Sequence, residues 1–259
     1  RNELRIEQID MLICSTGTPP ATTPSLATLI HYELSSGEPE SIAAFDINAA
    51  CSGYVYGLGI ARDHLAMNPG AKILLVTTEV LSRKTDVTDA DTAPVFGDAA
   101  TASLILGTGS SGTSRHGYGI AQTKLGAIGE PGEALRVPIE ADGRIFMDGP
   151  RVFQQAVRSM VDILNEACEA AGISAGELDL VVPHQANQRI INAVRQRLKA
   201  PTERVYSNIA ERGNTSSSTI PLALEELMGS RSHGEMIGLT AFGGGYTFAG
   251  AVLTAESPQ

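Results

Sequence analysis

Short apolar runs alternate with segments of helical periodicity along this chain. An apolar run over residues 41–47 precedes small and apolar positions spaced as on a helix from Val55 to Leu65, and this pattern predicts a strand followed by a helix. Residues 72–76 fit a buried strand, and no apolar run approaches the roughly 20 residues that cross a bilayer. We therefore expect a globular, soluble protein without a membrane segment.

The same unit occurs twice in the sequence. Residues 4–13 and 173–182 each read as a helix end, a polar turn with an acidic residue and a short apolar strand. Predicted helices follow at residues 24–34 and 187–198, and a further helix is predicted at 220–228. Residues 99–106 and 249–254 also resemble each other as closing strands. Strands that alternate with helices predict largely parallel sheets covered by helices. The repeat favours a duplicated α/β fold. Two ordinary strand–helix units without a duplication would give the same pattern.

Cys51 lies where the first of these strands turns into its helix. The dipole at a helix N-terminus favours an anion, and it can lower a thiol pKa from about 8.5 into the range of roughly 3.5–7.5. On this basis the sequence predicts a nucleophilic thiolate. A buried, inert cysteine is the structural alternative, and the local motif alone does not exclude it.

Three further motifs offer partners for this thiol. His184 follows a predicted strand and precedes an amphipathic helix, a usual position for chemistry in α/β proteins. Asn214 stands in a polar run before the predicted helix at residues 220–228, where the Ser and Thr residues also fit helix capping. A triple glycine, 243–245, separates two strand-like runs, which indicates a backbone that must approach something closely.

Five motifs in this order resemble the β-ketoacyl-acyl carrier protein synthases III, which are condensing enzymes of the thiolase fold. The motifs are Ala49-Ala50-Cys51-Ser52-Gly53, Phe96-Gly97-Asp98-Ala99-Ala100, Pro183-His184-Gln185-Ala186-Asn187, Gly213-Asn214-Thr215-Ser216 and Phe242-Gly243-Gly244-Gly245. The resemblance extends from about Ile9 to Leu253. It implies an α/β thiolase-like fold of two pseudo-duplicated halves, with mainly parallel sheets layered with helices. We place the boundary in the Gly- and Ser-rich loop 107–116, which gives halves of 1–107 and 108–259.

The resemblance implies a catalytic triad of Cys51, His184 and Asn214. Cys51 would take an acyl group from acyl-CoA, with the Cys51 and Gly244 N–H groups as the oxyanion hole. His184 and Asn214 would then stabilise the enolate that forms when malonyl-acyl carrier protein loses carbon dioxide. Chain-elongating synthases carry a second His in place of Asn214, and thiolases carry a second Cys where this chain has Phe242, so both relatives fit less well.

The resemblance also implies substrate contacts. Phe96, Gly149, Phe153 and Asn187 match positions near the acyl group or the pantetheine arm, and Arg189 matches a position that meets the acyl carrier protein. An ordinary core aromatic for Phe96 and a solvated surface Arg for Arg189 remain open alternatives.

Two positions depart from the family pattern. Ala90 stands where many members have an Arg that grips the coenzyme A nucleotide, which puts that contact in doubt. Thr23 replaces a Phe that closes the acyl pocket across the dimer in short-chain relatives. We therefore expect a primer longer than acetyl, bound near the dimer interface.

Composition narrows the setting of the protein. The chain has 259 residues, 42% of them hydrophobic, and a formal net charge of −10, which argues against nonspecific nucleic-acid binding. Three widely spaced cysteines without metal-type spacing fit a reducing cytoplasm. The resemblance implies a homodimer that needs no cofactor or metal besides its two substrates. The first residues read as the middle of a helix, so we expect the family's N-terminal segment to be missing from this sequence.

The residues leave two other functions open. A specialised ketosynthase or acyltransferase of secondary metabolism would keep the same triad. A non-catalytic homologue is the further alternative.

Overall fold

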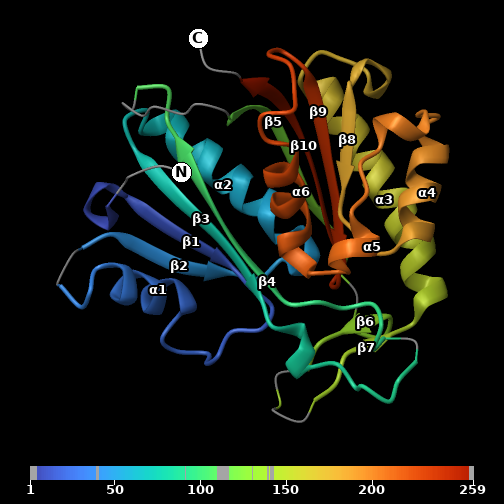
Figure 1. Ribbon diagram of the computed structural model, residues 1–259, viewed down its shortest axis with the longest axis horizontal. Helices are drawn as coiled ribbons and strands as arrows, with labels where there is room; N and C mark the ends of the chain where they lie inside the picture. Colours follow the sequence, from blue (N-terminus) through green and yellow to red (C-terminus); the bar gives the residue numbers. More distant parts are fainter. Residues whose placement is uncertain are drawn as a thin grey trace.

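Two four-stranded sheets form the framework of the protein (Figure 1). The computed structural model describes residues 5–38, 41–90, 92–109, 117–129, 131–138, 140 and 143–256. The first sheet has the order β2-β1-β3-β4, with β1 (Met11–Ser15), β2 (Ala43–Ile47), β3 (Lys72–Glu79) and β4 (Ala99–Leu106). The second has the order β5-β10-β9-β8, with β5 (Gly117–Ala127), β8 (Leu180–Pro183), β9 (Met236–Gly243) and β10 (Thr247–Glu256).

In each sheet three strands run in one direction and one strand opposes them. β4 is antiparallel to β3 in the first sheet, and β10 is antiparallel to both β9 and β5 in the second. The parallel pairs β1–β3 and β8–β9 occupy equivalent places beside these reversed strands. The predicted duplicated α/β fold with mainly parallel sheets is therefore confirmed.

Helices separate and cover the two sheets. They are α1 (Leu26–Leu34), α2 (Gly53–Met67), α3 (Gly149–Ala170), α4 (Gln188–Arg197), α5 (Ile209–Arg212) and α6 (Thr219–Leu227). α2 and α6 lie between the sheets, α1 covers the outer face of the first sheet, and α3 and α4 cover the outer face of the second (Figure 1). None of the helices in the described ranges is long and apolar enough to cross a membrane.

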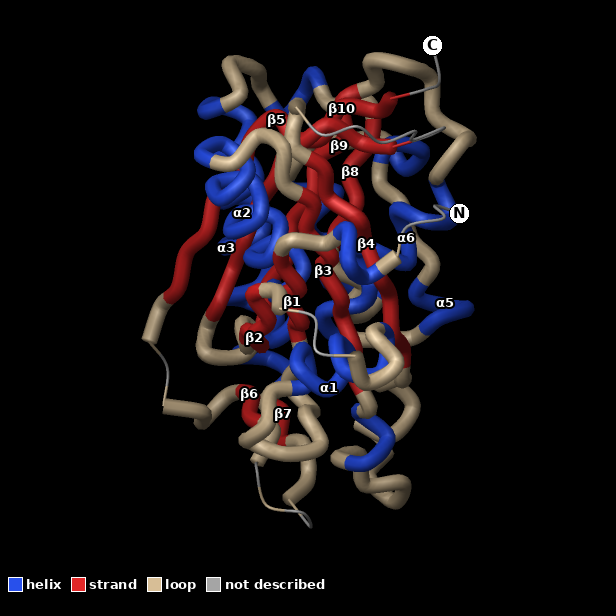
Figure 2. The backbone as a smooth tube through the Cα atoms, turned by 90° about the vertical axis from the view of Figure 1, so that its left-hand side faces the viewer, coloured by secondary structure: helices blue, strands red, loops and turns tan. Residues whose placement is uncertain are grey.

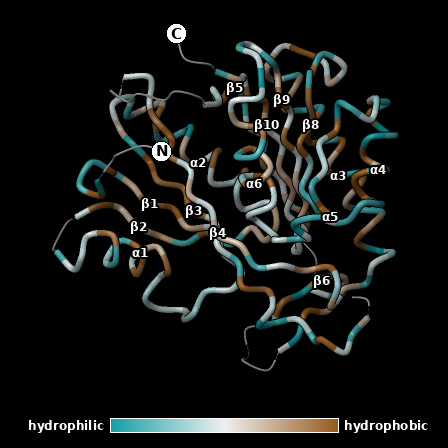
Figure 3. Tube along the Cα trace, viewed as in Figure 1, coloured by the Kyte–Doolittle hydropathy of each residue, from teal (hydrophilic) through white to brown (hydrophobic). Residues whose placement is uncertain are grey.

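The largest apolar cluster fills the space between the two sheets. Leu58 of α2 and Ile220 of α6 pack there with Leu75 of β3 and Leu239 of β9, all at most 3% exposed. Each such side chain contributes about 1.5–3 kcal/mol through burial. The central strands β1 and β3 are accordingly coloured as hydrophobic along much of their length in Figure 3.

Polar caps fix where the predicted helices begin. Ser25 caps α1, and Asp46 at the end of β2 accepts hydrogen bonds of 2.7 Å from both Leu26 N–H and Ala27 N–H. Asn187 caps α4 by accepting from Ile190 N–H at 2.9 Å. These carboxylate and amide oxygens satisfy backbone donors that a helix start leaves unpaired, so α1 and α4 start slightly inside their predicted ranges.

Two parts of the sequence-based description fall on residues that are not described. Residues 1–4, read as a helix end, lie outside the described residues, as do residues 110–116 of the predicted boundary loop. β4 ends at Leu106 and β5 begins at Gly117, so the two sheets come from the two sides of that loop. The division into halves of 1–107 and 108–259 stays a prediction.

A short hairpin, β6 (Leu135–Arg136) with β7 (Phe146–Met147), lies at one end of the molecule (Figures 1 and 2).

Candidate active site

The turn that carries Cys51 is held by residues from both halves of the chain. A short 3₁₀ turn, Ala50–Ser52, joins the end of β2 to α2, and Asn48 accepts from Ala50 N–H at 3.2 Å. At the start of β10, the Thr247 hydroxyl donates to Ala49 O at 2.7 Å, and the Thr247 carbonyl oxygen accepts from the Ser52 hydroxyl at 3.2 Å. This cross-linking fixes the backbone on both sides of the nucleophile.

Cys51 opens into a cavity of about 200 Å³. Its lining residues are Gly17, Asn48, Ala50, Cys51, Glu79, Leu81, Phe96, Leu135, Arg136, Val137, Ile145, Ser216 and Gly244. Phe96 and Gly244, both predicted from the sequence, thus share a cavity with the thiol. The walls combine segments that are up to about two hundred positions apart in the sequence, so the cavity exists only in the folded chain.

The environment of Cys51 does not favour a thiolate in the resting protein. The pKa of the Cys51 thiol is raised to about 11, chiefly by burial. The negative charge of Glu79 acts in the same direction, while the Ser216 side chain and the Cys51 N–H act against it. The prediction that the helix start lowers this pKa is wrong for the resting protein, because desolvation of the thiolate outweighs the dipole.

His184 and Asn214 lie in the second half and are buried. His184 follows β8, and burial lowers its pKa to about 3, so the imidazole is neutral. Its Nδ1 lies 2.7 Å from Thr219 Oγ1. Asn214 Oδ1 accepts from Ser216 N–H at 2.9 Å, and Nδ2 donates to Ala186 O at 3.4 Å. One N–H of the Asn214 amide is thereby left for a ligand among the described contacts.

The loop with Asn214 is joined to the loop with Phe96. Gly97 N–H donates to Asn214 O at 2.9 Å, and Asn214 N–H donates to Val95 O at 2.8 Å. Phe96 therefore lies in the cavity wall at the place where the two halves meet. His184 and Asn214 are not themselves part of the cavity wall, and their connection to it runs through Ser216.

Glu79 and Ser216 are cavity residues that sequence reasoning did not identify. Glu79 ends β3 and is 1% exposed. It accepts hydrogen bonds from Ser216 and Ser217 in the second half and from Gly17 and Thr18 in the first. An acidic residue at the end of a strand with an apolar stretch at residues 73–76 was the signal in the sequence, but its partners are too distant along the chain to form a motif.

The glycine loop approaches Cys51 closely. A Cβ on Gly243 would lie 2.7 Å from Cys51 N and 2.9 Å from the Ala50 Cβ. A Cβ on Gly244 would lie 3.3 Å from Leu135 O, a tighter than average but less severe contact. The predicted close approach of this backbone is thus real, and Gly243 is the residue at which it is closest.

The remaining predicted residues lie outside the cavity wall. Thr23 is exposed before α1, and Gly149 is exposed at the start of α3. Phe153 packs partly buried against the cluster between α3, α4 and the second sheet. Asn187 uses its side-chain oxygen as the cap of α4, and Arg189 is exposed on that helix.

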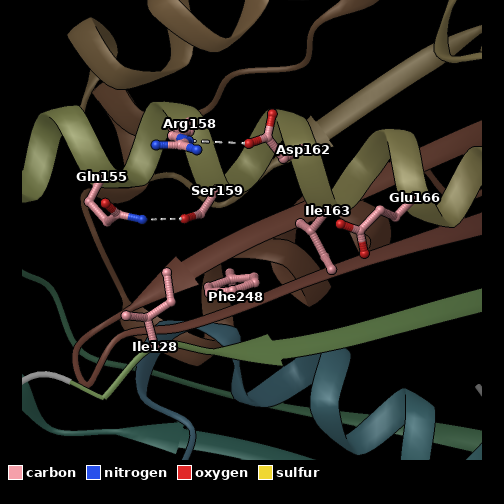
Figure 4. Close-up of a pocket in the computed structure, with 8 residues that line it drawn as sticks. All are labelled: Ile128, Gln155, Arg158, Ser159, Asp162, Ile163, Glu166 and Phe248. Carbon is pink, nitrogen blue, oxygen red and sulfur yellow. Dashed lines mark hydrogen bonds and ion pairs between the residues drawn. The ribbon is translucent and has the colours of Figure 1, made fainter.

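A second cavity, of about 280 Å³, lies between α3 and the β5–β10 pair (Figure 4). Gln155 donates to Ser159 at 2.9 Å and Arg158 pairs with Asp162 at 3.5 Å along its wall, so these polar groups satisfy each other. None of the residues predicted for chemistry lines it. We assign it no part in the reaction.

Comparisons with known proteins point to one family. The model of 3-oxoacyl-[acyl-carrier-protein] synthase III matches residues 45–129, and the model of its C-terminal part matches residues 168–255. A β-ketoacyl-[acyl-carrier-protein] synthase III of Aquifex aeolicus is 40% identical over 95% of this chain and 77% of its own length.

Solved structures agree with this result. The crystal structure of 3-oxoacyl-[acyl-carrier-protein] synthase III from Aquifex aeolicus has a TM-score of 0.86 and 37% identity, over 97% of this chain and 79% of its own. A priming β-ketosynthase of a polyketide biosynthetic pathway has a TM-score of 0.84 and 33% identity, over 99% of this chain and 78% of its own.

Proposed function

Because the chain belongs to the 3-oxoacyl-[acyl-carrier-protein] synthase III family, we propose that it condenses an acyl primer with malonyl-acyl carrier protein on Cys51. The reaction class is acyl transfer followed by decarboxylating condensation. The observation that carries the residue assignment is the cavity that places Cys51 beside Gly244 and Phe96, with Ser216 leading to Asn214. The product starts a fatty-acid-type chain.

In the first half-reaction, Cys51 Sγ attacks the thioester carbonyl of acyl-CoA. The Cys51 and Gly244 N–H groups hold the oxyanion, and each such donor is typically worth about 2.7–4 kcal/mol. The C–S bond to coenzyme A then breaks, and the coenzyme A thiol leaves with the proton that Cys51 gave up. The high pKa of Cys51 means that this proton is still on the thiol when the substrate arrives.

In the second half-reaction, malonyl-acyl carrier protein loses carbon dioxide, and the electron pair of the broken C–C bond forms an enolate. With the Thr219 hydroxyl donating to Nδ1, the neutral His184 carries its proton on Nε2. This N–H and Asn214 Nδ2–H donate to the thioester oxygen that becomes the enolate oxygen. The enolate carbon attacks the acyl carbonyl, and Cys51 leaves as the thiolate, which takes up a proton from solvent before the next turnover. A neutral His184 suits this role, because its low pKa keeps it a hydrogen-bond donor rather than an acid.

The first half-reaction is tested by mass spectrometry of the intact protein after incubation with acyl-CoA. We expect one acyl group on Cys51, no adduct on Cys51→Ala, and a normal adduct on Cys168→Ala, whose cysteine is buried on α3. An unlabelled wild type with an intact fold would refute the acyl-transfer proposal.

The second half-reaction is tested with enzyme that already carries the acyl group. His184→Ala and Asn214→Ala should acylate but release little carbon dioxide from malonyl-acyl carrier protein. Asn192→Ala is a matched control, since Asn192 is exposed on α4 and bonds only to Gln188 among the described contacts. Normal condensation by both site variants would contradict their roles.

Substrate contacts and assembly complete the proposal. Arg189 on α4 is proposed to bind the acidic carrier protein, and Arg189→Glu should raise KM for that substrate without slowing acylation. Phe96, Gly149, Phe153 and Asn187 are proposed to contact the acyl group or the pantetheine arm.

We further propose a homodimer that forms through β2 and α1 and works in the cytoplasm without a cofactor or metal. β2 pairs only with β1 among the described strands, and α1 exposes Tyr32 and Leu34. Analytical ultracentrifugation should give a dimer mass.

A specialised priming ketosynthase is the second candidate. It is favoured by the 33% identity to the polyketide priming enzyme and by Thr23, which leaves room for a longer or branched primer. The acyl-CoA preference of the protein decides between the two, and strict use of acetyl-CoA would exclude this candidate.

A further inference from the structure

Ser216 contacts, directly or through one side chain, each member of the proposed triad. Its N–H donates to Asn214 Oδ1 at 2.9 Å, and its side chain lines the same cavity as Cys51 and lowers the pKa of that thiol. Its carbonyl oxygen lies 3.1 Å from Thr219 Oγ1, which is 2.7 Å from His184 Nδ1. No other residue in the described part of the chain links all three.

The backbone of Ser216 is in an unfavourable conformation. Its φ is 53°, in the left-handed region that non-glycine residues seldom adopt. Such a conformation persists only where the surroundings hold it in place. Here the Ser216 N–H donates to Asn214, the Ser216 hydroxyl donates to Glu79, and Thr219 Oγ1 lies 3.1 Å from the Ser216 carbonyl oxygen.

Glu79 anchors the Ser216 hydroxyl. Ser216 Oγ donates to Glu79 Oε1 at 3.1 Å. Gly17 N–H donates to Oε2 at 3.1 Å and Thr18 Oγ1 donates to it at 3.1 Å. Within the described residues no Lys, Arg or His forms an ion pair with this carboxylate.

A buried carboxylate is costly unless hydrogen bonds replace its water. Glu79 receives these hydrogen bonds from the loop 17–18 of the first half and from Ser216 and Ser217 of the second. It therefore ties the two halves together next to the thiol.

We infer that Ser216, anchored by the Glu79 carboxylate, is a positioning residue that holds Cys51, Asn214 and His184 in the arrangement needed for condensation. The inference rests on the proposed function for its last step. Neither residue is proposed to touch the reacting carbons.

Ser217 provides a matched control beside it. Its hydroxyl also donates to Glu79 Oε1, at 3.0 Å, and it is 1% exposed. It makes no hydrogen bond to Asn214, Thr219 or Cys51 among the described contacts. Ser216→Ala and Ser217→Ala thus remove the same hydroxyl from the same carboxylate. Ser216→Ala also removes the side chain that acts on Cys51, and it releases from Glu79 the residue whose backbone contacts Asn214 and Thr219.

The first readout is the rate of Cys51 alkylation by iodoacetamide between pH 7 and pH 10, followed by mass spectrometry. The charged side chains in the cavity wall with Cys51 are those of Glu79 and Arg136, because His184 stays neutral. Ser216→Ala should slow alkylation roughly tenfold, because it removes the polar side chain that lowers the pKa of the Cys51 thiol. Glu79→Gln should speed alkylation, because it removes a repelling charge, and Ser217→Ala should stay within about twofold of wild type.

The second readout is single-turnover condensation of the acylated protein with malonyl-acyl carrier protein. Ser216→Ala and Glu79→Gln should each lower this rate roughly tenfold or more with little change in KM, and Ser217→Ala should not. Glu79→Gln then reacts faster in one assay and slower in the other. General loosening of the fold does not produce this opposite pair.

The outcomes separate the two proposals. Equal effects of Ser216→Ala and Ser217→Ala in both assays, or slower alkylation by Glu79→Gln, would overturn the positioning role. If wild type shows no condensation while the alkylation differences appear as expected, the link between Ser216 and the thiol stands and the proposed function fails.

Discussion

Gly243→Ala tests whether the close approach of the glycine loop to Cys51 matters for acyl transfer. The new Cβ would lie 2.7 Å from Cys51 N, where ordinary contacts begin at 3.4 Å, so the two must separate by about 0.7 Å. Two of its three neighbours, Cys51 N and the Ala50 Cβ, belong to a turn that Thr247 and Asn48 hold fixed, and the third is Thr247 Oγ1 itself, at 2.9 Å. The turn cannot yield without moving the nucleophile and its N–H.

The size of this displacement sets the expected loss of stability and of acylation rate. Overpacking of this kind costs about 1–3 kcal/mol of stability, and a misplacement near 1 Å in an active site can cost about 100-fold in rate. We expect Gly243→Ala to lower the acylation rate of Cys51 roughly 30- to 100-fold, with a lowered melting temperature.

Two other glycine-to-alanine substitutions serve as controls. Gly70→Ala adds a methyl group where nothing lies within 4 Å and should leave rate and stability unchanged. Gly244→Ala meets Leu135 O at 3.3 Å, a contact that a few tenths of an ångström relieve, so it should acylate faster than Gly243→Ala. The acylation rate is measured by mass spectrometry during the first turnover. If Gly243→Ala acylated at the wild-type rate, the reasoning from this contact would be wrong.

Three further predictions follow from the same structure. The pKa of His184 is about 3 in the folded protein and near 6.5 in the unfolded chain, so its contribution to stability is present above pH 6.5 and is lost as pH falls towards 3. His184→Asn should therefore make the decline of the melting temperature between pH 7 and pH 4 shallower than in wild type. Parallel declines of the two proteins would contradict this prediction. Alkylation of the folded protein should modify Cys51 alone, because Cys14 and Cys168 are fully buried and burial raises their pKa values to about 12 and about 11. If peptide mapping found Cys14 or Cys168 labelled at a rate similar to that of Cys51, the fold around that cysteine would be contradicted. Thr23→Phe should shift the acyl-CoA preference towards shorter primers, and an unchanged chain-length profile would place the acyl tail elsewhere.

The sequence predicted helices and strands well where the hydrophobic periodicity and a capping residue indicated the same boundary. The strand before Cys51, the helix after it and the repeated strands β1 and β8 lie where the periodicity placed them. Asn187 marked the start of α4 because an amide oxygen at that position satisfies the first backbone donors.

The cavity wall was less predictable, because its parts are joined by contacts between distant segments. Glu79 and Ser216 are 137 positions apart, and nothing in either local sequence specifies the other. Leu135 and Arg136 reach the cavity through a two-residue strand in a loop-rich region, which has no strong periodicity. The direction of the Cys51 pKa shift was also missed, since burial by residues of the second half depends on the assembled fold.

The charge states of Cys51 and His184 constrain how the reaction proceeds. A raised pKa for the thiol and a lowered pKa for the imidazole both favour the neutral pair over a thiolate and an imidazolium ion. A resting ion pair, which would favour hydrolysis, is therefore disfavoured before the substrate binds. The thiol must instead lose its proton as the acyl-CoA carbonyl is attacked, when the oxyanion hole first has a charge to stabilise. The second half-reaction needs no base, because decarboxylation supplies the carbanion. A site of neutral donors around a protonated thiol thus suits condensation better than it suits hydrolysis, and burial, with a smaller effect of the Glu79 charge, keeps the thiol protonated between turnovers.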